Sequence, residues 1–274
     1  MKVWAIAVSK DHKWVVCGSD EGANVWDAEL HEKILEVEST LTSVFAIDLS
    51  PDSTQLATSA RREASVWSIT SGKRIIGPLK HNEVVIGVRF SPSGKQIATL
   101  IPGGSVRIFD SHNGDQLLDI KADSPSQFTV GVIPLAWSND GHQIFAITDN
   151  NMIKSFAFPT GSPLAKSPIL KHERSICIAG GNGKFIATVS EEAVSFLDSS
   201  TLAKIGTAIS RDSEGKWSTA VSLESGRIAV GREDGKIIVH NLANFLPDSY
   251  GPFHVSICPF HPVGLSDNHI HTLY

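Results

Sequence analysis

The densest group of potential metal ligands lies near the C-terminal end of the sequence, at Cys258, His261, His269 and His271. Thiolate and imidazole groups are common ligands of Zn²⁺, and four of them complete a tetrahedral site. However, Cys-x-x-His followed by His-x-His matches no common zinc module, and two prolines make the segment irregular. We therefore expect a frayed chain end here and no metal.

A glycine-rich segment at residues 180–184, Gly-Gly-Asn-Gly-Lys, resembles a phosphate-binding loop. A P-loop has a further glycine five residues before its Gly-Lys pair, and Ser or Thr directly after that pair. Ile178 and Phe185 occupy those two positions. The segment is therefore interpreted as a structural turn.

Residues that could support nucleophilic catalysis form no recognisable motif. No Gly-x-Ser-x-Gly elbow is present in the sequence. Cys17 and Cys177 lie in apolar runs, where cysteine behaves as a small core residue. The sequence thus predicts that the protein is not an enzyme and binds no cofactor.

The elements that must position these residues repeat along the chain. A turn rich in Ser, Asp and Gly ends at residues 12, 53, 94, 141, 183 and 226, at intervals of 41, 41, 47, 42 and 43 residues. A second recurring position follows each turn by 14 or 15 residues. It is occupied by Trp26, Trp67, Phe109, Phe156, Leu197 and His240. Repeats of this length indicate one supersecondary unit copied along the chain.

Each unit contains four short apolar, β-branched runs separated by turn residues. In the third unit these runs are 84–90, 96–100, 105–109 and 116–120. Such runs predict β-strands, and no apolar stripe of helical period continues for three turns. Four strands in about 40 to 45 residues is the pattern of a β-propeller blade.

In these repeated turns and strands the chain resembles the WD-repeat family over residues 3–253. The best matches are Ser50-Pro51-Asp52 with Trp67, Ser91-Pro92-Ser93-Gly94 with Phe109-Asp110, and Gly231-Arg232-Glu233-Asp234-Gly235. The resemblance implies an all-β propeller of four-stranded blades. Its single domain has six units, at about 3–40, 41–81, 82–128, 129–173, 174–214 and 215–253.

The resemblance also implies structural roles. The Trp-Asp positions of the repeat are Trp26-Asp27, Trp67 and Phe109-Asp110, and we expect both tryptophans in the core. Asp20 and Asp234 hold the position of the family's turn aspartate. In the family, His, Asp, Ser or Thr, and Trp form a hydrogen-bonded network within a blade, but no unit here has every member. We therefore expect the blades to be held mainly by apolar packing.

The number of blades stays open at this point. The chain begins at the innermost strand of its first unit, and the β-prone residues 253–258 supply the missing outer strand in one interpretation. Six blades then close into a ring, with the rest of 254–274 as a tail. In the other interpretation, a seventh blade lies upstream in a longer protein.

Three aromatic residues share one repeat position at the entry to the innermost strand: Trp4, Phe45 and Trp217. Such a position either wedges between blades or anchors a partner at the rim of the channel. Loops expected around the same rim contain Arg61, Arg62, His81, Glu83, His172, Arg174 and Arg232. We expect this rim to bind a protein or peptide, because loops on a rigid scaffold often carry binding function.

Composition excludes several other classes. The 274 residues include 24 Lys and Arg and 29 Asp and Glu, a formal net charge of −5. Nucleic-acid and membrane-surface binders need a basic face, so neither kind of partner is predicted. Three widely spaced cysteines favour a reducing compartment, and the sequence shows no signal peptide, so we expect an intracellular, cytoplasmic protein.

Two alternatives to an interaction scaffold remain. The degenerate repeats resemble the C-terminal arrays of large fungal nucleotide-triphosphatase signalling proteins, which implies a structural or sensor module of a larger protein. A small ligand bound or converted in the central channel would instead require convergent polar groups there. The sequence indicates neither the oligomeric state nor the identity of a partner.

Overall fold

The computed structural model describes residues 3–37, 43–102, 105–121, 135–148, 152–168, 177–180, 184–189, 193–210, 218–222, 226–231, 237–251 and 271–273. The chain divides into two compact units, residues 1–164 and 165–274. Among the described residues, β-strands account for almost all regular structure, and the only helices are the short 3₁₀ segments η2 (Leu242–Asn244) and η3 (Asp248–Tyr250).

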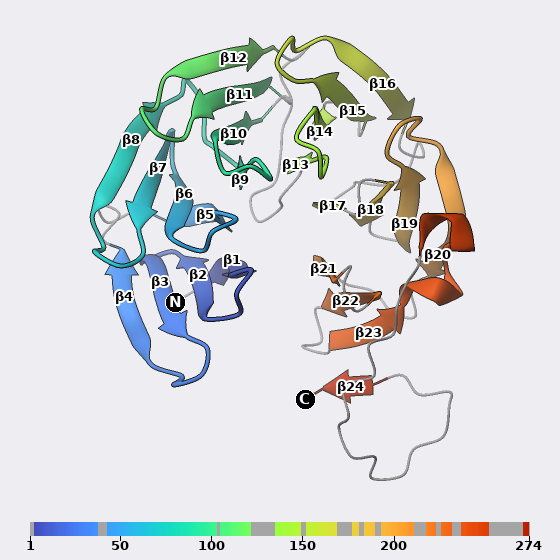
Figure 1. Ribbon diagram of the computed structural model, residues 1–274, viewed down its shortest axis with the longest axis horizontal. Coiled ribbons are helices and arrows are strands. Elements are labelled where there is room, and N and C mark those ends of the chain that lie inside the picture. The colour runs from blue at the N-terminus through green and yellow to red at the C-terminus, as the bar shows by residue number, and fades with distance from the viewer. Residues whose placement is uncertain are drawn as a thin grey trace. The chain divides into compact units, whose positions relative to one another are not determined.

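Unit 1 is built from four antiparallel sheets of four strands each (Figure 1). The first two sheets are β1 (Val3–Val8), β2 (Trp14–Ser19), β3 (Gly22–Asp27), β4 (Lys33–Val37), and β5 (Val44–Leu49), β6 (Gln55–Ala60), β7 (Glu63–Ser68), β8 (Arg74–Lys80). The next two are β9 (Gly87–Phe90), β10 (Gln96–Ile101), β11 (Ser105–Asp110), β12 (Gln116–Ile120), and β13 (Leu135–Trp137), β14 (Gln143–Thr148), β15 (Met152–Ala157), β16 (Pro163–Pro168), the last of which runs across the boundary between the units.

Unit 2 contains two further four-stranded sheets. Their strands are β17 (Cys177–Gly180), β18 (Phe185–Val189), β19 (Ala193–Asp198), β20 (Lys204–Ser210), and β21 (Ser218–Ser222), β22 (Arg227–Gly231), β23 (Ile237–Asn241), β24 (His271–Leu273).

The first strands of consecutive sheets lie side by side within each unit. In unit 1, β1 neighbours β5, β5 neighbours β9, and β9 neighbours β13; in unit 2, β17 neighbours β21. The remaining strands of each sheet follow outward in sequence order. This is the arrangement of propeller blades. The predicted all-β propeller with four-stranded blades is therefore confirmed.

Five of the sheets follow the predicted repeat strand for strand, whereas the β21–β24 sheet departs from it. Its outer strand is β24, which pairs with β23 through His271–Leu273. The expectation that residues 253–258 would fill this place was wrong. The physical reason is that the chain does not turn back after Asn241, as it does after the third strand of every other sheet. It enters η2, which begins at a side-chain cap from Asn241.

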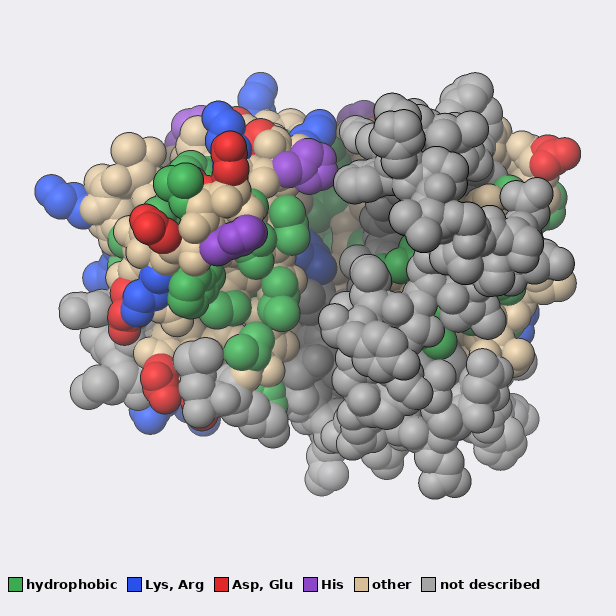
Figure 2. Space-filling view, turned by 90° about the horizontal axis from the view of Figure 1, so that it is seen from below, with side chains coloured by type: hydrophobic (Ala, Val, Ile, Leu, Met, Phe, Trp, Pro, Cys, Tyr) green, Lys and Arg blue, Asp and Glu red, His purple; other side chains and the backbone are tan. Residues whose placement is uncertain are grey.

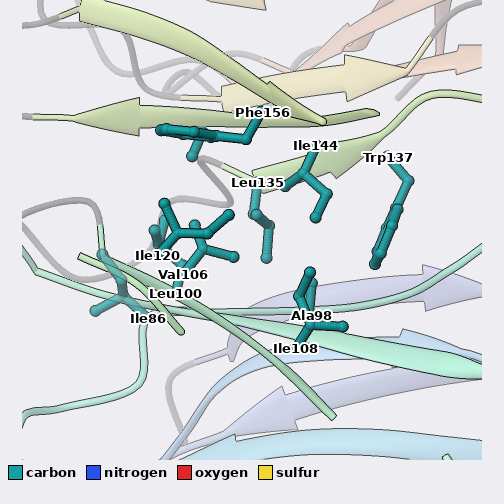
Figure 3. Close-up of a cluster of buried hydrophobic side chains, with 11 residues drawn as sticks. Ile86, Ala98, Leu100, Val106, Ile108, Ile120, Leu135, Trp137, Ile144 and Phe156 are labelled. Carbon is teal, nitrogen blue, oxygen red and sulfur yellow. The ribbon is translucent and has the colours of Figure 1, made fainter. Parts of the chain in front are cut away.

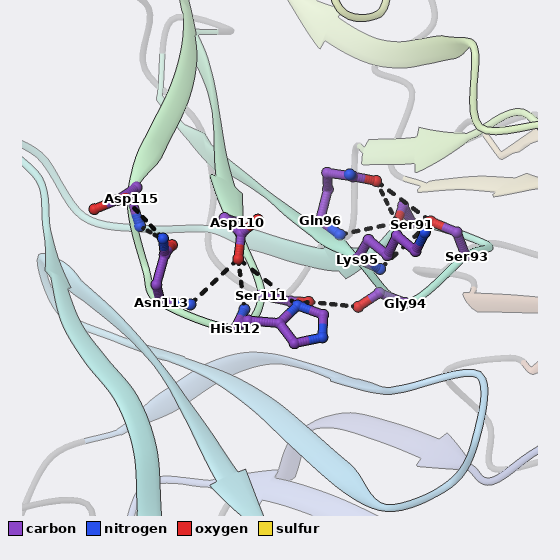
Figure 4. A network of polar contacts seen from close by, with 10 residues as sticks. All are labelled: Ser91, Ser93, Gly94, Lys95, Gln96, Asp110, Ser111, His112, Asn113 and Asp115. Carbon is purple, nitrogen blue, oxygen red and sulfur yellow. Dashed lines mark hydrogen bonds and ion pairs between the residues drawn. The ribbon is translucent and has the colours of Figure 1, made fainter.

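The repeated Ser-x-Asp turns are held by one hydrogen-bond pattern. Ser50 Oγ donates to Asp52 Oδ1 at 2.5 Å and accepts from the backbone N–H of Gln55 at 2.9 Å. The same pair of contacts recurs at Ser9 and Ser138. Figure 4 shows the third turn, where Ser93 replaces the aspartate, beside the turn capped by Asp110. The side-chain oxygens thus fix the connection between first and second strands, as expected for Asx and Ser turns.

The core of unit 1 consists of three layers, each between two neighbouring sheets. In the third layer, the β9–β12 sheet contributes side chains such as Leu100 and Ile108, and the β13–β16 sheet contributes Leu135 and Ile144 (Figure 3). The first and second layers join the first three sheets in the same way. Each inner sheet therefore uses both faces in packing.

Repeat-equivalent residues fill equivalent places in these layers. Leu56, Ile97 and Ile144 share one position on the second strand of sheets two, three and four, and each is fully buried. Side chains of similar volume at one repeated position produce repeated packing, since core density tolerates little variation in volume. The 41- and 47-residue intervals in the sequence are thus the spacing of core layers.

Candidate functional site

The innermost strands β1 and β5 carry a bulge at the position predicted to hold rim aromatics. The pairing of β1 with β2 skips Trp4, and the pairing of β5 with β6 skips Phe45. The unpaired residue of a bulge is re-aimed relative to the regular pleat, and bulges recur beside functional sites. The repeat therefore places two aromatic side chains at the same special backbone position on adjacent blades.

These two aromatic side chains contact each other. The ring centroids of Trp4 and Phe45 are 5.9 Å apart, and the rings meet edge to face at 69°. Both side chains are half-buried, and the neighbouring Val3 is 42% exposed. The pair thus packs between the two blades and leaves part of its surface open.

Two exposed loops lie at the same end of these sheets. The loop between β2 and β3 contains Asp20 and Glu21, and the loop between β6 and β7 contains Arg61 and Arg62. Arg61 adopts a positive φ of 51°, a conformation uncommon for residues other than glycine, asparagine and aspartate. All four charged side chains are exposed, as predicted for the two arginines.

His81 does not belong to the exposed rim, contrary to the sequence-based prediction. It is only 8% exposed, and its ring nitrogens contact Thr99 Oγ1 at 2.8 Å and the carbonyl oxygen of Leu79 at 3.0 Å. Burial lowers the pKa of His81 to about 4, with the nearby Arg107 acting in the same direction. The neutral imidazole is therefore a structural group, whereas Glu83 in the same loop is exposed.

Parts of the family's internal network survive in two blades. In the third sheet, Thr99 Oγ1 donates to the carbonyl of Arg107 at 3.3 Å, and His81 packs edge to face on Phe109 at 5.7 Å. In the second sheet, Trp67 Nε1 donates to Thr58 Oγ1 at 2.9 Å. Among the described residues, then, one blade keeps the histidine half of the network and another keeps the tryptophan half.

Trp26 also departs from prediction, because its side chain is 38% exposed and not in the core. The reason lies in the sheet that carries it. The equivalent residues Trp67 and Phe109 face the preceding sheet of unit 1, whereas Trp26 belongs to the first sheet, together with the exposed Ile6 and Val8. Hydrophobic side chains of the described residues gather on the face seen in Figure 2.

The remaining predicted positions divide into two groups. Asp27 and Asp110 cap the turns after the third strands, and Asp110 Oδ1 accepts from the backbone N–H of His112 at 2.7 Å. Their carboxylates thus hold the turns that follow the third strands. Five predicted residues lie outside the described part of the chain: Trp217, His172, Arg174, Arg232 and Asp234.

The potential zinc ligands give no site in the described structure. Cys258, His261 and His269 lie outside the described residues, and no group of three or more His, Cys, Asp or Glu elsewhere in the described part could hold a metal ion. None of the described helices has the length and hydropathy needed to cross a membrane.

Four-stranded blades with Ser-x-Asp turns are the features expected of a WD-repeat β-propeller, and comparison with known proteins points to the same family. A family model described as "WD domain, G-beta repeat" matches residues 1–27. These matches, together with the four-stranded blades, support a WD-repeat family for this chain.

Three relatives share parts of the chain. Small ribosomal subunit protein RACK1 from Caenorhabditis elegans is 26% identical over 155 residues, which covers 54% of this chain and 47% of that protein. RACK1 from Drosophila melanogaster is 26% identical over 51% of this chain and 45% of its own length. Coronin-7 from Bos taurus is 22% identical over 48% of this chain and 15% of its own length. The match thus spans less than half the length of each of these relatives.

The sequence analysis missed one charged residue of the rim, Glu21. It also missed the opposite charges of two equivalent loops on neighbouring blades. Glu21 was not singled out, and Asp20 was considered only as a structural turn residue, yet both side chains are exposed beside the aromatic pair. The signal was present in the repeat, because Asp20-Glu21 and Arg61-Arg62 are separated by one 41-residue interval.

Proposed function

We propose that this chain is a non-catalytic interaction module that binds a protein or peptide segment at the rim formed by Trp4, Phe45 and the two loops beside them. The observation that supports this most is the repeated bulge. It holds a contacting aromatic pair half-buried on rigid strands, with exposed charged loops around it. Aromatic anchors surrounded by polar groups are the common form of an interaction hot spot.

The setting of the module belongs to the same proposal. We take the β21–β24 sheet, which β24 completes, as a blade of the second unit. Two relatives are described as small ribosomal subunit proteins, which supports an intracellular location and a role within assemblies. The likeness to fungal nucleotide-triphosphatase signalling proteins stays a prediction.

Selection of a random peptide library displayed on phage against the full chain tests the proposal. The dissociation constants of selected peptides are then measured for the wild type and for Trp4→Leu and Phe45→Leu. Leucine keeps an apolar side chain at each position, so the layer between the blades is retained. We expect affinity to fall about tenfold or more, because an anchor that loses most of its aromatic contact costs upward of 1.4 kcal/mol.

Trp26→Ala is the matched control, because Trp26 is a partly exposed tryptophan at the opposite end of its sheet from the rim. Selected peptides should bind this variant as tightly as the wild type. Peptides that bind all variants equally, or a selection that enriches no sequence, would show that the rim is not a binding site.

A further inference from the structure

The rim carries opposite charges at one repeated loop position on adjacent blades. Asp20 and Glu21 lie in the β2–β3 loop, and Arg61 and Arg62 lie at the equivalent positions of the β6–β7 loop, 41 residues later. A repeated backbone thus presents two carboxylates on the first blade and two guanidinium groups on the second. All four side chains are exposed.

Some other charged side chains on the same two sheets have a partner of opposite charge. On the first sheet, Lys33 Nζ lies 2.6 Å from Glu36 Oε2. On the second sheet, Lys80 stands directly opposite Glu63 in the strand register. Glu83 is one further exposed carboxylate near the arginines. The two loops therefore set two carboxylates on one blade against two guanidinium groups on the next.

Backbone contacts hold both loops in place. The carbonyl of Arg61 accepts a hydrogen bond from the N–H of Val85 at 2.6 Å, and the carbonyl of Arg62 accepts one from the N–H of His81 at 2.8 Å. In the first blade, the N–H of Glu21 donates to Ser19 Oγ at 3.1 Å. Since both loops are fixed before a partner arrives, little ordering entropy is lost on binding.

The aromatic pair belongs to the same two blades as these loops. Val3, which precedes Trp4, pairs with Ser19 at the start of the acidic loop. Val44, which precedes Phe45, pairs with Ala60 at the start of the basic loop. Each bulged aromatic therefore lies beside the loop of its own blade. The rim offers an apolar contact at its centre, with an acidic corner on one blade and a basic corner on the next.

Resting on the proposed function, we propose that this rim binds a peptide segment in which a cationic side chain and a carboxylate flank an apolar or aromatic residue. The cation pairs with Asp20 and Glu21, and the carboxylate pairs with Arg61 and Arg62, whose planar groups suit a carboxylate. Opposite charges at the two ends fix the direction in which the segment lies. A segment of uniform charge would be attracted at one corner and repelled at the other.

The test uses the full chain and the same phage-displayed library. Two loop variants reverse one corner each, D20R/E21R and R61E/R62E, and a third variant combines all four changes. We expect peptides selected on the wild type to carry both charges around an apolar residue. Their affinity should fall about tenfold in either loop variant, because attraction is replaced by repulsion. The combined variant should bind versions of these peptides in which the cationic residue and the carboxylate residue have exchanged places.

Lys95→Glu is the control, because it reverses a charge in a turn at the other end of its sheet from the rim loops. It should leave the dissociation constants within about twofold, and urea midpoints establish that each variant is folded. Peptides that lose affinity for Trp4→Leu but show no paired charges, or that ignore both loop variants, would overturn this inference while the proposed function stands. If no selected peptide is sensitive to Trp4→Leu, the proposed function itself fails.

Discussion

Arg89 Nη1 donates a hydrogen bond to Asp48 Oδ1 at 3.0 Å and joins the innermost strands of two neighbouring blades. The other carboxylate oxygen of Asp48 accepts from the backbone N–H of Phe90 at 2.7 Å. Asp48 and Arg89 occupy the same repeat position, one on β5 and one on β9. Burial raises the pKa of Asp48, and the positive charge of Arg89 opposes that effect.

Removal of one partner should therefore be costly. Arg89→Met leaves Asp48 without its counter-charge, and we expect the free energy of unfolding to fall by about 2 kcal/mol, below the 3–5 kcal/mol of a fully buried pair. The expected loss is smaller because the side chains of Arg89 and Asp48 are still 25% and 20% exposed to solvent. The combined variant D48N/R89M should recover part of the loss. Urea denaturation at pH 7 measures both, and a combined variant less stable than R89M would contradict the account.

His81 should make stability depend on pH in a mildly acidic range. Its folded pKa of about 4 lies below the ordinary value of 6.5, so the unfolded chain binds a proton more readily. This contribution to stability is complete above pH 6.5 and is lost as the pH falls from 6.5 to 4. His81→Gln removes the titrating group. The difference in urea midpoint between wild type and variant should therefore shrink from pH 7 to pH 5, and a constant difference would argue against it.

Trp26 and Phe109 occupy the same Trp-Asp position of the repeat, but their substitution should reduce the free energy of unfolding by different amounts. Phe109 is 5% exposed and packs in the second layer, so Phe109→Ala should cost about 3–5 kcal/mol. Trp26 is 38% exposed, and Trp26→Ala should cost about 1 kcal/mol, since much of its surface already contacts water. Chemical denaturation of the two variants side by side checks this order. Equal losses would mean that Trp26 is covered in solution.

Gly206 should not tolerate a side chain. It has a positive φ of 61°, and a Cβ built there would lie 2.0 Å from the carbonyl oxygen of Phe245. Gly141 has a similar φ of 72°, but its nearest neighbour to such a Cβ is 3.8 Å away. Gly141→Ala should therefore cost about 1 kcal/mol from backbone conformation alone. Gly206→Ala should cost clearly more, and thermal unfolding of both variants isolates the steric part.

Much of the fold could be predicted from the spacing of the repeated turns, because each turn and strand is specified by residues close together in the sequence. The Ser-x-Asp turns and the positions of Leu56, Ile97 and Ile144 could be found in this way. Trp26 could not, because its burial depends on whether its blade has a neighbour on that face. The burial of His81 depends on Thr99, which lies on a different strand.

The candidate site was predictable to a similar degree. The shared position of Trp4 and Phe45 was visible in the sequence, but their bulges and mutual contact depend on the pairing of β1 and β5 with their neighbours. The outer strand of the last sheet was misplaced because the chain continues into η2 after Asn241 and β24 forms only at His271–Leu273. Such a return over a long stretch of chain has no local signal.

The layered core of unit 1 links its blades in series, with energetic consequences beyond any single contact. The first sheet takes part in one layer of this unit, whereas the sheets β5–β8 and β9–β12 each take part in two. Within unit 1, detachment of the first sheet thus disrupts one core layer, whereas loss of a middle sheet disrupts two, as in a chain of units coupled to nearest neighbours. Amide protons of the two middle sheets should therefore exchange with solvent more slowly than those of the first sheet.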